Sequence, residues 1–260
     1  MLDWISYWQF KKKPFDRDIA PFLAIPGRIE VVDELLSEVV ADAPMLQIFG
    51  ASGMGVSSVW REVSKRAKSP NRRVSAATAS GDRLTLYREL ARNIGVSTTR
   101  LLTEPEIWRG LQQALETARR QGFSVLVAVD DVQTLMDDPG ALDRLKIFER
   151  DGVSLLVAGR CSGFEQAVQV ELPALTRSQA VIFLNLKLKD AGRDGSLFRP
   201  EALARLHAEA RGIPAALENL AERALRLGAA KGAEAVSLAI VEAISQDQVF
   251  PGWRTDRLVG

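Results

Sequence analysis

The sequence predicts an α/β fold, in which a parallel sheet is sandwiched between helices and is followed by a small all-helical lid. Three observations lead to this prediction. Short apolar segments alternate with segments of helical periodicity as far as about Leu175. The segment FSVLVAVDD (123–131) is nearly all apolar and β-branched, as expected of a central parallel strand buried on both faces. After Leu175 the helical pattern continues without a further strand.

Each expected strand is a short, largely apolar run. The strands cover 45–50, 72–79, 123–131, 153–159 and 167–172. Apolar residues recur at helical spacing elsewhere, for example Ile29, Val32, Leu35 and Val39, and Pro105 suits a first helical turn. Helices are expected at 28–40, 57–68, 82–94, 105–120, 139–150, 176–191, 200–210, 214–228 and 234–245. The alternation of strands and helices favours right-handed crossovers between parallel strands.

These elements divide the chain into four parts. Residues 1–27 form an aromatic-rich extension, in which three prolines break any long helix. We expect its Trp4, Trp8 and Phe10 to lie in a core or a docking contact, and an exposed partner-binding patch is the alternative. The α/β domain at 28–175, the helical lid at 176–246 and a tail at 247–260 follow.

Bulk properties exclude several classes of protein. The formal net charge of +1 creates no global field that would attract nucleic acid or an anionic membrane. A single cysteine, Cys161, excludes an internal disulfide framework, and a single histidine, His207, argues against a histidine-built metal or triad site. No run of about 18 apolar residues predicts a membrane span, and MLDWISYWQFKKK is no signal peptide because its charges follow the apolar stretch. We therefore expect a cytoplasmic protein.

A glycine-rich loop joins the first expected strand to a helix, which is the context of a phosphate-binding P-loop. The usual pattern is GxxxxGK[ST]; here Gly50 and Gly55 match, Ser57 holds the magnesium position, and Val56 replaces the lysine. Glycines let backbone amides approach a phosphate, and the helix N-terminus adds partial positive charge. The predicted nucleotide-binding residues are Gly50, Ala51, Ser52, Gly53, Met54, Gly55, Val56, Ser57 and Ser58. A glycine-rich turn without a ligand is the alternative.

Two acids end the strand VLVAVDD, which is the Walker B pattern of P-loop NTPases. In this pattern the first acid, Asp130, holds Mg²⁺ together with Ser57. The second acid usually polarises the attacking water and is a glutamate in AAA+ ATPases. Asp131 is about one methylene shorter than glutamate, which makes it a weak catalytic candidate. Two solvated acids at the start of a loop are the alternative interpretation.

Several motifs together resemble the ExeA/GspA-like AAA+ ATPases of type II secretion, which are related to the transposition ATPases MuB and TniB. The matching segments share their order with that family over roughly residues 8–245. They are WQFKKKPFDRDIAPFLAIPGR (8–28), VDDVQTL (129–135), LLVAGR (155–160), LPALTRSQAVIFLNLKLKDAG (172–192) and FRPEALARLHAEARGIPAALENLAERAL (198–225). The resemblance implies a P-loop AAA+ fold that binds ATP or ADP with Mg²⁺.

The chain departs from this family's pattern at the positions that carry the chemistry. Val56 replaces the P-loop lysine, Asp131 the Walker B glutamate, Arg160 the sensor-1 glutamine, and Ala215 the arginine of the GIPR motif. The segment that carries an arginine toward a neighbouring subunit is shortened to CSGFEQ (161–166) and has lost that arginine. We therefore expect nucleotide binding to be weak or absent and hydrolysis to be slow or absent. The opposing hypothesis is that Arg160 or Arg61 replaces the lost charge.

Three functions remain as hypotheses. The first is a non-hydrolysing assembly subunit that works beside other proteins, such as an active AAA+ paralogue or a secretion-complex component, which would place it peripherally at the inner membrane. The second is a slow but active ATPase of the ExeA type. The third is a DNA-associated regulator like the transposition ATPases, because WREVSKRAKSPNRR (60–73) holds six basic residues and one acid. A solvated helix face is the simpler interpretation of that basic stretch.

Overall fold

The computed structural model describes residues 3–16, 22–79, 82–99, 103–135, 138–150, 152–160, 164 and 166–246. The chain forms two compact units. The α/β unit comprises Arg28–Ala51 and Val56–Leu172, and the helical unit comprises Met1–Gly27, Ser52–Gly55 and Pro173–Gly260. Residues 1–27, which the sequence sets apart as an extension, thus share a unit with the helices that follow the sheet. Four loop residues after the first strand also belong to the helical unit.

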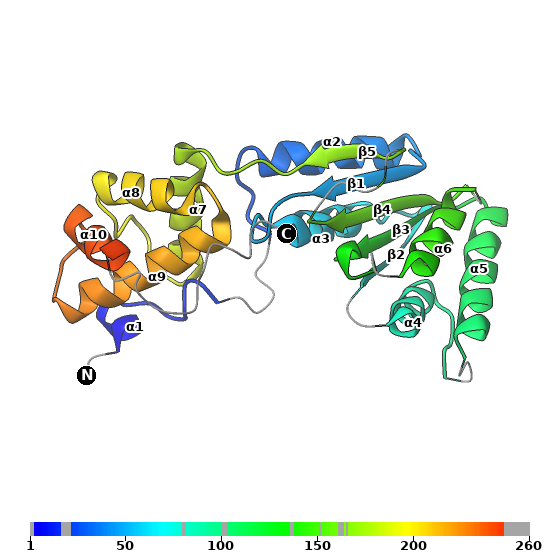
Figure 1. Cartoon of the computed structure of the whole chain (residues 1–260), viewed down its shortest axis with the longest axis horizontal. Coiled ribbons are helices and arrows are strands. Elements are labelled where there is room, and N and C mark those ends of the chain that lie inside the picture. Colours follow the sequence, from blue (N-terminus) through cyan, green and yellow to red (C-terminus); the bar gives the residue numbers. More distant parts are fainter. Residues whose placement is uncertain are drawn as a thin grey trace. The chain divides into compact units, whose positions relative to one another are not determined.

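The α/β unit is built on a parallel sheet, as predicted (Figure 1). Its strand order is β2-β3-β4-β1-β5. The strands are β1 (Met45–Phe49), β2 (Arg72–Thr78), β3 (Ser124–Asp130), β4 (Ser154–Gly159) and β5 (Val168–Glu171). Thr78 pairs with Asp130 across β2 and β3, and Phe49 pairs with Gly159 across β1 and β4. The carboxyl ends of β1, β3 and β4 therefore meet at one edge of the sheet.

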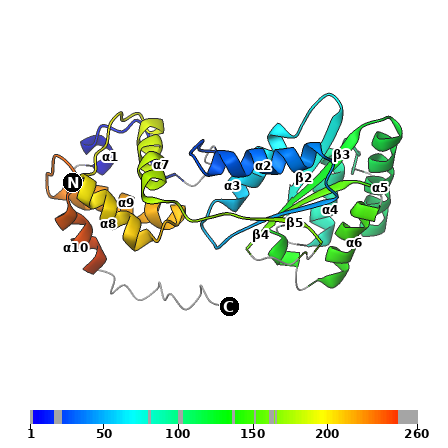
Figure 2. The same ribbon diagram turned by 90° about the horizontal axis from the view of Figure 1, so that it is seen from above.

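Helices cover both faces of this sheet (Figures 1 and 2). On one face lie α2 (Arg28–Val40) and α3 (Val56–Arg66); on the other lie α4 (Arg83–Asn93), α5 (Glu104–Arg120) and α6 (Pro139–Arg150). Apolar side chains of β3 and β4, such as Val127 and Leu155, are fully buried in one cluster with α4, α5 and α6. Burial on both faces explains why these strands are almost uniformly apolar.

Local caps fix the limits of the helices. Thr103 and Glu106 form a capping box at the start of α5, with Pro105 in its first turn. Asp82 accepts a hydrogen bond from the Thr85 N–H and caps α4. A short 3-10 helix, η1 (Val132–Leu135), follows β3 and has no counterpart among the predicted elements. Its four residues are too few for a periodic pattern to develop.

The helical unit contains α1 (Trp4–Tyr7), α7 (Arg177–Asp190), α8 (Pro200–Ala210), α9 (Pro214–Ala230) and α10 (Leu238–Gln246). The start of α10 differs from the predicted residue 234. Val236 exchanges backbone hydrogen bonds with Leu197 and Arg199 and forms a bridge with Phe198, so the chain before α10 is extended. A sequence window cannot reveal a pairing partner almost forty residues away.

The N-terminal segment is docked into the helical unit. Trp8 and Phe10 are buried in the same apolar cluster as residues of α7, α8, α9 and α10, and Trp4 is half-buried against it. The Trp8 Nε1–H donates to the Leu225 carbonyl at 2.8 Å, and the Tyr7 hydroxyl donates to the Ala233 carbonyl at 2.9 Å. These aromatic residues are therefore core residues and not a free patch. Among the described residues, no helix is both long and apolar enough to span a bilayer.

Candidate nucleotide site

The loop between β1 and α3 leads from a strand directly into a helix N-terminus, as a phosphate-binding loop does. Gly53 and Gly55 adopt φ values of 84° and 90°, in the left-handed region that favours glycine. The helix α3 begins at Val56, which places Ser57 and Ser58 in its first turn. A helix N-terminus presents free backbone N–H groups and favours an anion. Both features support phosphate binding at segment 50–58, which stays a prediction.

Two glycines of this loop are held by close packing. A Cβ atom at Gly50 would lie 3.3 Å from a methyl of Val56, so the valine side chain lies against the start of the loop. A Cβ atom at Gly53 would lie 2.8 Å from the Cβ of Ala215 at the start of α9. The Gly53 carbonyl also accepts a hydrogen bond from the Ala215 N–H at 3.2 Å. Loop residues 52–55 are thus part of the packing of the helical unit.

The remaining predicted loop residues differ in their exposure. Ala51, Ser52 and Ser57 are exposed, Val56 and Ser58 are half-buried, and Met54 is buried. The valine at the lysine position brings no charge to the loop.

The structure brings together the two groups predicted to hold Mg²⁺. Asp130, at the carboxyl end of β3, is only 5% exposed, and its carboxylate accepts a hydrogen bond from the Ser57 hydroxyl. The backbone N–H of Asp131 donates to Asp130 Oδ1 at 2.8 Å. Burial raises the pKa of Asp130, and these hydrogen bonds together with the positive charge of Arg61 oppose that rise. A carboxylate whose charge is disfavoured by burial gains from a nearby cation.

The oxygen atoms of Ser57 and Asp130 fit Mg²⁺, which prefers hard oxygen ligands and keeps positions for water and substrate phosphates. Within the described part of the chain, no cluster of three or more His, Cys, Asp or Glu residues could hold a metal by itself. Nucleotide phosphates would have to complete the coordination. Ser57 and Asp130 therefore offer two of the oxygen ligands that a nucleotide-bound Mg²⁺ would need.

Asp131 is held in a different way from Asp130. Its backbone adopts φ 60°, and its carboxylate accepts a hydrogen bond from the Gln133 side-chain amide. The Gln133 Oε1 in turn accepts from the backbone N–H of Arg160 at 3.2 Å. This chain of contacts links the end of β3 to the end of β4, where Arg160 is exposed. The Asp131 carboxylate is thereby engaged by a neighbour on its own loop.

Sequence reasoning assigned no role to Gln133, although it lies in the VDDVQTL motif. Its spacing of two residues from Asp131 places the amide beside the carboxylate only because Asp131 adopts the left-handed conformation and η1 follows at once. Thr134 adds a second tie, since its hydroxyl donates to the Ala79 carbonyl at the end of β2. Side chains of η1 therefore tie the loop after the two acids to the ends of both β2 and β4.

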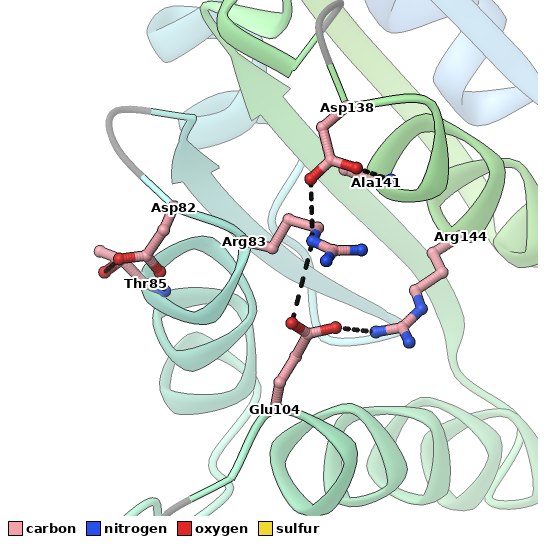
Figure 3. A network of polar contacts seen from close by, with 7 residues as sticks. All are labelled: Asp82, Arg83, Thr85, Glu104, Asp138, Ala141 and Arg144. Carbon is pink, nitrogen blue, oxygen red and sulfur yellow. Dashed lines mark hydrogen bonds and ion pairs between the residues drawn. The ribbon is translucent and has the colours of Figure 1, made fainter.

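An ionic network lies beyond η1 and joins the starts of α4, α5 and α6 (Figure 3). Arg83 contacts Asp138 at 2.8 Å and Glu104 at 3.8 Å, and Arg144 also pairs with Glu104. Asp138 caps α6 by accepting from the Ala141 N–H at 3.2 Å. The network ties the starts of these three helices together. Its members come from four separated positions, so no local pattern predicts it.

The basic stretch 60–73 is partly neutralised in the fold. Arg66 pairs with Asp33 at 2.9 Å and Arg72 pairs with Asp42 at 2.8 Å. The Arg73 guanidinium lies 4.2 Å from the centre of the Phe123 ring.

Two further residues singled out in the sequence have simple outcomes. His207 Nε2 is 2.8 Å from the Leu175 carbonyl, which is a structural contact. Cys161 lies outside the described residues, as does most of the CSGFEQ segment.

Comparisons with known proteins agree with this geometry. A family model described as "AAA domain" matches residues 40–168. Among solved structures, the chain is similar to the Aeropyrum pernix ORC1 protein in complex with DNA, with TM-score 0.67, 18% identity and coverage of 89% of this chain and 68% of that one. It is also similar to the Aeropyrum pernix ORC2 protein in its ADPNP–ADP complexes, with TM-score 0.68, 17% identity and coverage of 92% and 72%. The CDC6P protein of Pyrobaculum aerophilum gives TM-score 0.70 at 16% identity, covering 95% and 73%.

No curated protein matches the chain. The sheet, the loop and the solved structures together define the fold as a P-loop AAA+ fold like that of the ORC and Cdc6 proteins. The narrower resemblance to ExeA/GspA stays a prediction.

Proposed function

We propose that this chain is an AAA+ subunit that binds Mg-nucleotide weakly and works by assembling with partner proteins, with hydrolysis slow or absent. The observation that supports this most directly is the contrast between the two acids. Asp130 stands beside Ser57, ready to hold a metal, whereas Asp131 is bound to Gln133. This contrast supports a site that binds Mg-nucleotide but has lost part of its catalytic machinery.

Each residue then has a defined part in binding. The backbone amides of the first turn of α3 would hold the phosphates. Ser57 and Asp130 would hold Mg²⁺, which supplies positive charge to those phosphates when bound. The ligand class is ATP or ADP, since the similar ORC2 protein was solved with ADPNP and ADP. Val56 adds no charge, so we propose an affinity well below that of a complete P-loop.

Hydrolysis requires a group that activates water and cations that stabilise the transition state. Asp131 is short, and its carboxylate already accepts from Gln133. Losing an arginine finger alone costs about 10³–10⁵ in rate, and the CSGFEQ segment has no arginine. These losses together support a protein whose output is binding.

The partner class that we propose is another protein subunit, either an active AAA+ paralogue or a secretion-complex component. The ordered match to the ExeA/GspA motifs supports this choice. A role in which a nucleotide stabilises an assembly needs the Ser57–Asp130 pair, but it does not need Asp131 to be free.

Calorimetry with ATP, with and without Mg²⁺, combined with a phosphate-release assay, tests the proposal. We expect weak, Mg²⁺-enhanced binding, with phosphate release at the level of a protein-free control. Asp130→Asn should remove the Mg²⁺ enhancement, whereas exposed Asp143→Asn should not.

Two outcomes would decide against the proposal. If calorimetry detects no heat at millimolar ATP, the chain would be a scaffold that binds no nucleotide. Tight binding with phosphate release that Asp130→Asn abolishes would establish an active ATPase.

A DNA-associated role is the second candidate, because the similar ORC1 structure is in complex with DNA. Salt-dependent binding of duplex DNA that is lost when Lys65, Arg66, Lys68, Arg72 and Arg73 are neutralised would favour it. Arg66 and Arg72 already pair with carboxylates. Comparing variants at these two positions with variants at the other three therefore makes the assay more discriminating.

A further inference from the structure

A cation stands one helical turn beyond the metal-holding serine. Ser57 and Arg61 both lie in α3 and are four residues apart, so their side chains emerge from one face with Cβ atoms about 5–6 Å apart. Side chains of an α-helix lean toward its N-terminus, and a long one covers the turn before its own Cα. A side chain as long as that of Arg61 can therefore reach back to the turn at which an anion would bind.

Arg61 keeps its charge available. It is exposed, and no carboxylate among the described residues lies within ion-pair distance of it. Its neighbour Arg66 on the same helix is already paired with Asp33. Arg61 also lies near enough to Asp130 for their opposite charges to attract, and Asp130 has no other such cationic neighbour among the described residues. Arg160, the other cation considered for this role, stands at the end of β4 without such an effect.

We propose that Arg61 supplies the bound nucleotide phosphates with the positive charge that Val56 does not. This inference rests on the nucleotide binding proposed above and assigns a further binding residue to that site. A guanidinium suits the task because it presents paired N–H donors in a plane that matches two phosphate oxygens. Arg61 is four residues after Ser57, so it approaches the phosphates from the helix face of Ser57, which residue 56 does not share.

This placement has a consequence for the metal. An Arg61 guanidinium and a hydrated Mg²⁺ would both bring positive charge to the same phosphates. Arg61 therefore makes binding less dependent on Mg²⁺. Removing the arginine should leave a site that relies on Mg²⁺ alone.

Calorimetry on the full chain, with ATP and inorganic tripolyphosphate as probes, tests the inference. Arg61→Ala should raise the Kd for both probes about tenfold or more, the usual effect of losing a charge-assisted contact. Its remaining ATP binding should disappear when EDTA replaces Mg²⁺. Arg61→Lys should restore part of the affinity. Lys65→Ala removes the same charge one turn farther along α3 from an exposed position, and should change the Kd by less than about twofold.

The outcomes separate this inference from the proposed function. Equal Kd values for wild type and Arg61→Ala, with Ser57→Ala clearly weakened, would overturn the role of Arg61 and leave the nucleotide site standing. An equal loss in Arg61→Ala and Lys65→Ala would also overturn it, since the effect would then be general electrostatics. Absence of binding by the wild type would overturn both. Circular dichroism of each variant verifies that the fold is retained.

Discussion

The nearness of Asp130 and Ser57 was predictable from the sequence, because Asp130 ends one strand and Ser57 begins the helix after another. Their role in holding Mg²⁺ stays a prediction. The contact of Gln133 with Asp131 was not predictable, because it depends on one left-handed residue and on a short 3-10 turn. Arg61 was recognisable as a charge but not as a neighbour of Asp130, since that relation requires the helix to be placed against the end of β3. Residue types were therefore readable from the sequence, and their partners were not.

The burial of Asp130 should limit the stability of the ligand-free protein. Because the pKa of Asp130 is raised in the folded state, its charge is an unfavourable contribution that is present above the folded pKa and vanishes as the pH falls below the ordinary value. At pH 7, without Mg²⁺ or nucleotide, Asp130→Asn should raise the free energy of unfolding, on the order of 1 kcal/mol. The gain should shrink as the pH falls toward 4. Thermal melts at the two pH values measure it, with exposed Asp143→Asn as control. A variant less stable at pH 7 would mean that the lost charge-assisted hydrogen bonds dominate.

Most elements could be predicted because their periodicity and their caps agree. The capping box at Thr103 and Pro105 marks α5, and the apolar runs of β3 and β4 mark buried parallel strands. The failures have two causes. The start of α10 depends on the pairing of Val236 with a distant segment, and η1 is too short for a periodic pattern to develop.

The network at the starts of α4, α5 and α6 should contribute more than an ordinary surface ion pair. Glu104 is 25% exposed in its side chain and serves two arginines, Arg83 and Arg144, and Arg144 also lies over the Tyr87 and Trp108 rings. Glu104→Gln should lower the free energy of unfolding by about 1–2 kcal/mol in urea denaturation. Glu116→Gln, on the same helix, disrupts an exposed pair with Arg120 and should cost about 0.5 kcal/mol or less. Equal losses of stability in the two variants would show that the network contributes no more than ordinary surface ion pairs.

At the scale of the whole molecule, the sequence predicted the parallel sheet and the helices that follow it. It did not predict which helices receive the N-terminal segment. Trp8 and Leu225 are joined by a hydrogen bond across 217 positions, and no periodicity links such distant residues. The aromatic content of the first residues indicated a core contact, and the choice of surface was left to tertiary packing.

The docked N-terminal segment should be a major source of stability for the helical unit. Trp8 is 4% exposed, contacts the surface of Gly228 and donates a hydrogen bond to the Leu225 carbonyl. Trp8→Ala should destabilise this unit by about 3–5 kcal/mol, the usual range for a buried aromatic residue. Urea unfolding followed by circular dichroism measures the loss. Trp4→Ala, at a half-buried site, should cost clearly less. A small effect of Trp8→Ala would show that the segment contributes little to folding.

The contact between Gly53 and Ala215 bears on how this lineage would evolve. Any side chain at 53 would collide with the Cβ of Ala215, and the backbone there already demands glycine. Selection for folding alone would therefore retain this glycine after nucleotide binding had been abandoned. Among descendants of this protein, a preserved Gly53 would record the packing against α9. The side chain at position 61 is exposed, so packing does not constrain it. Whether arginine is kept or lost there would show whether phosphate binding is still under selection.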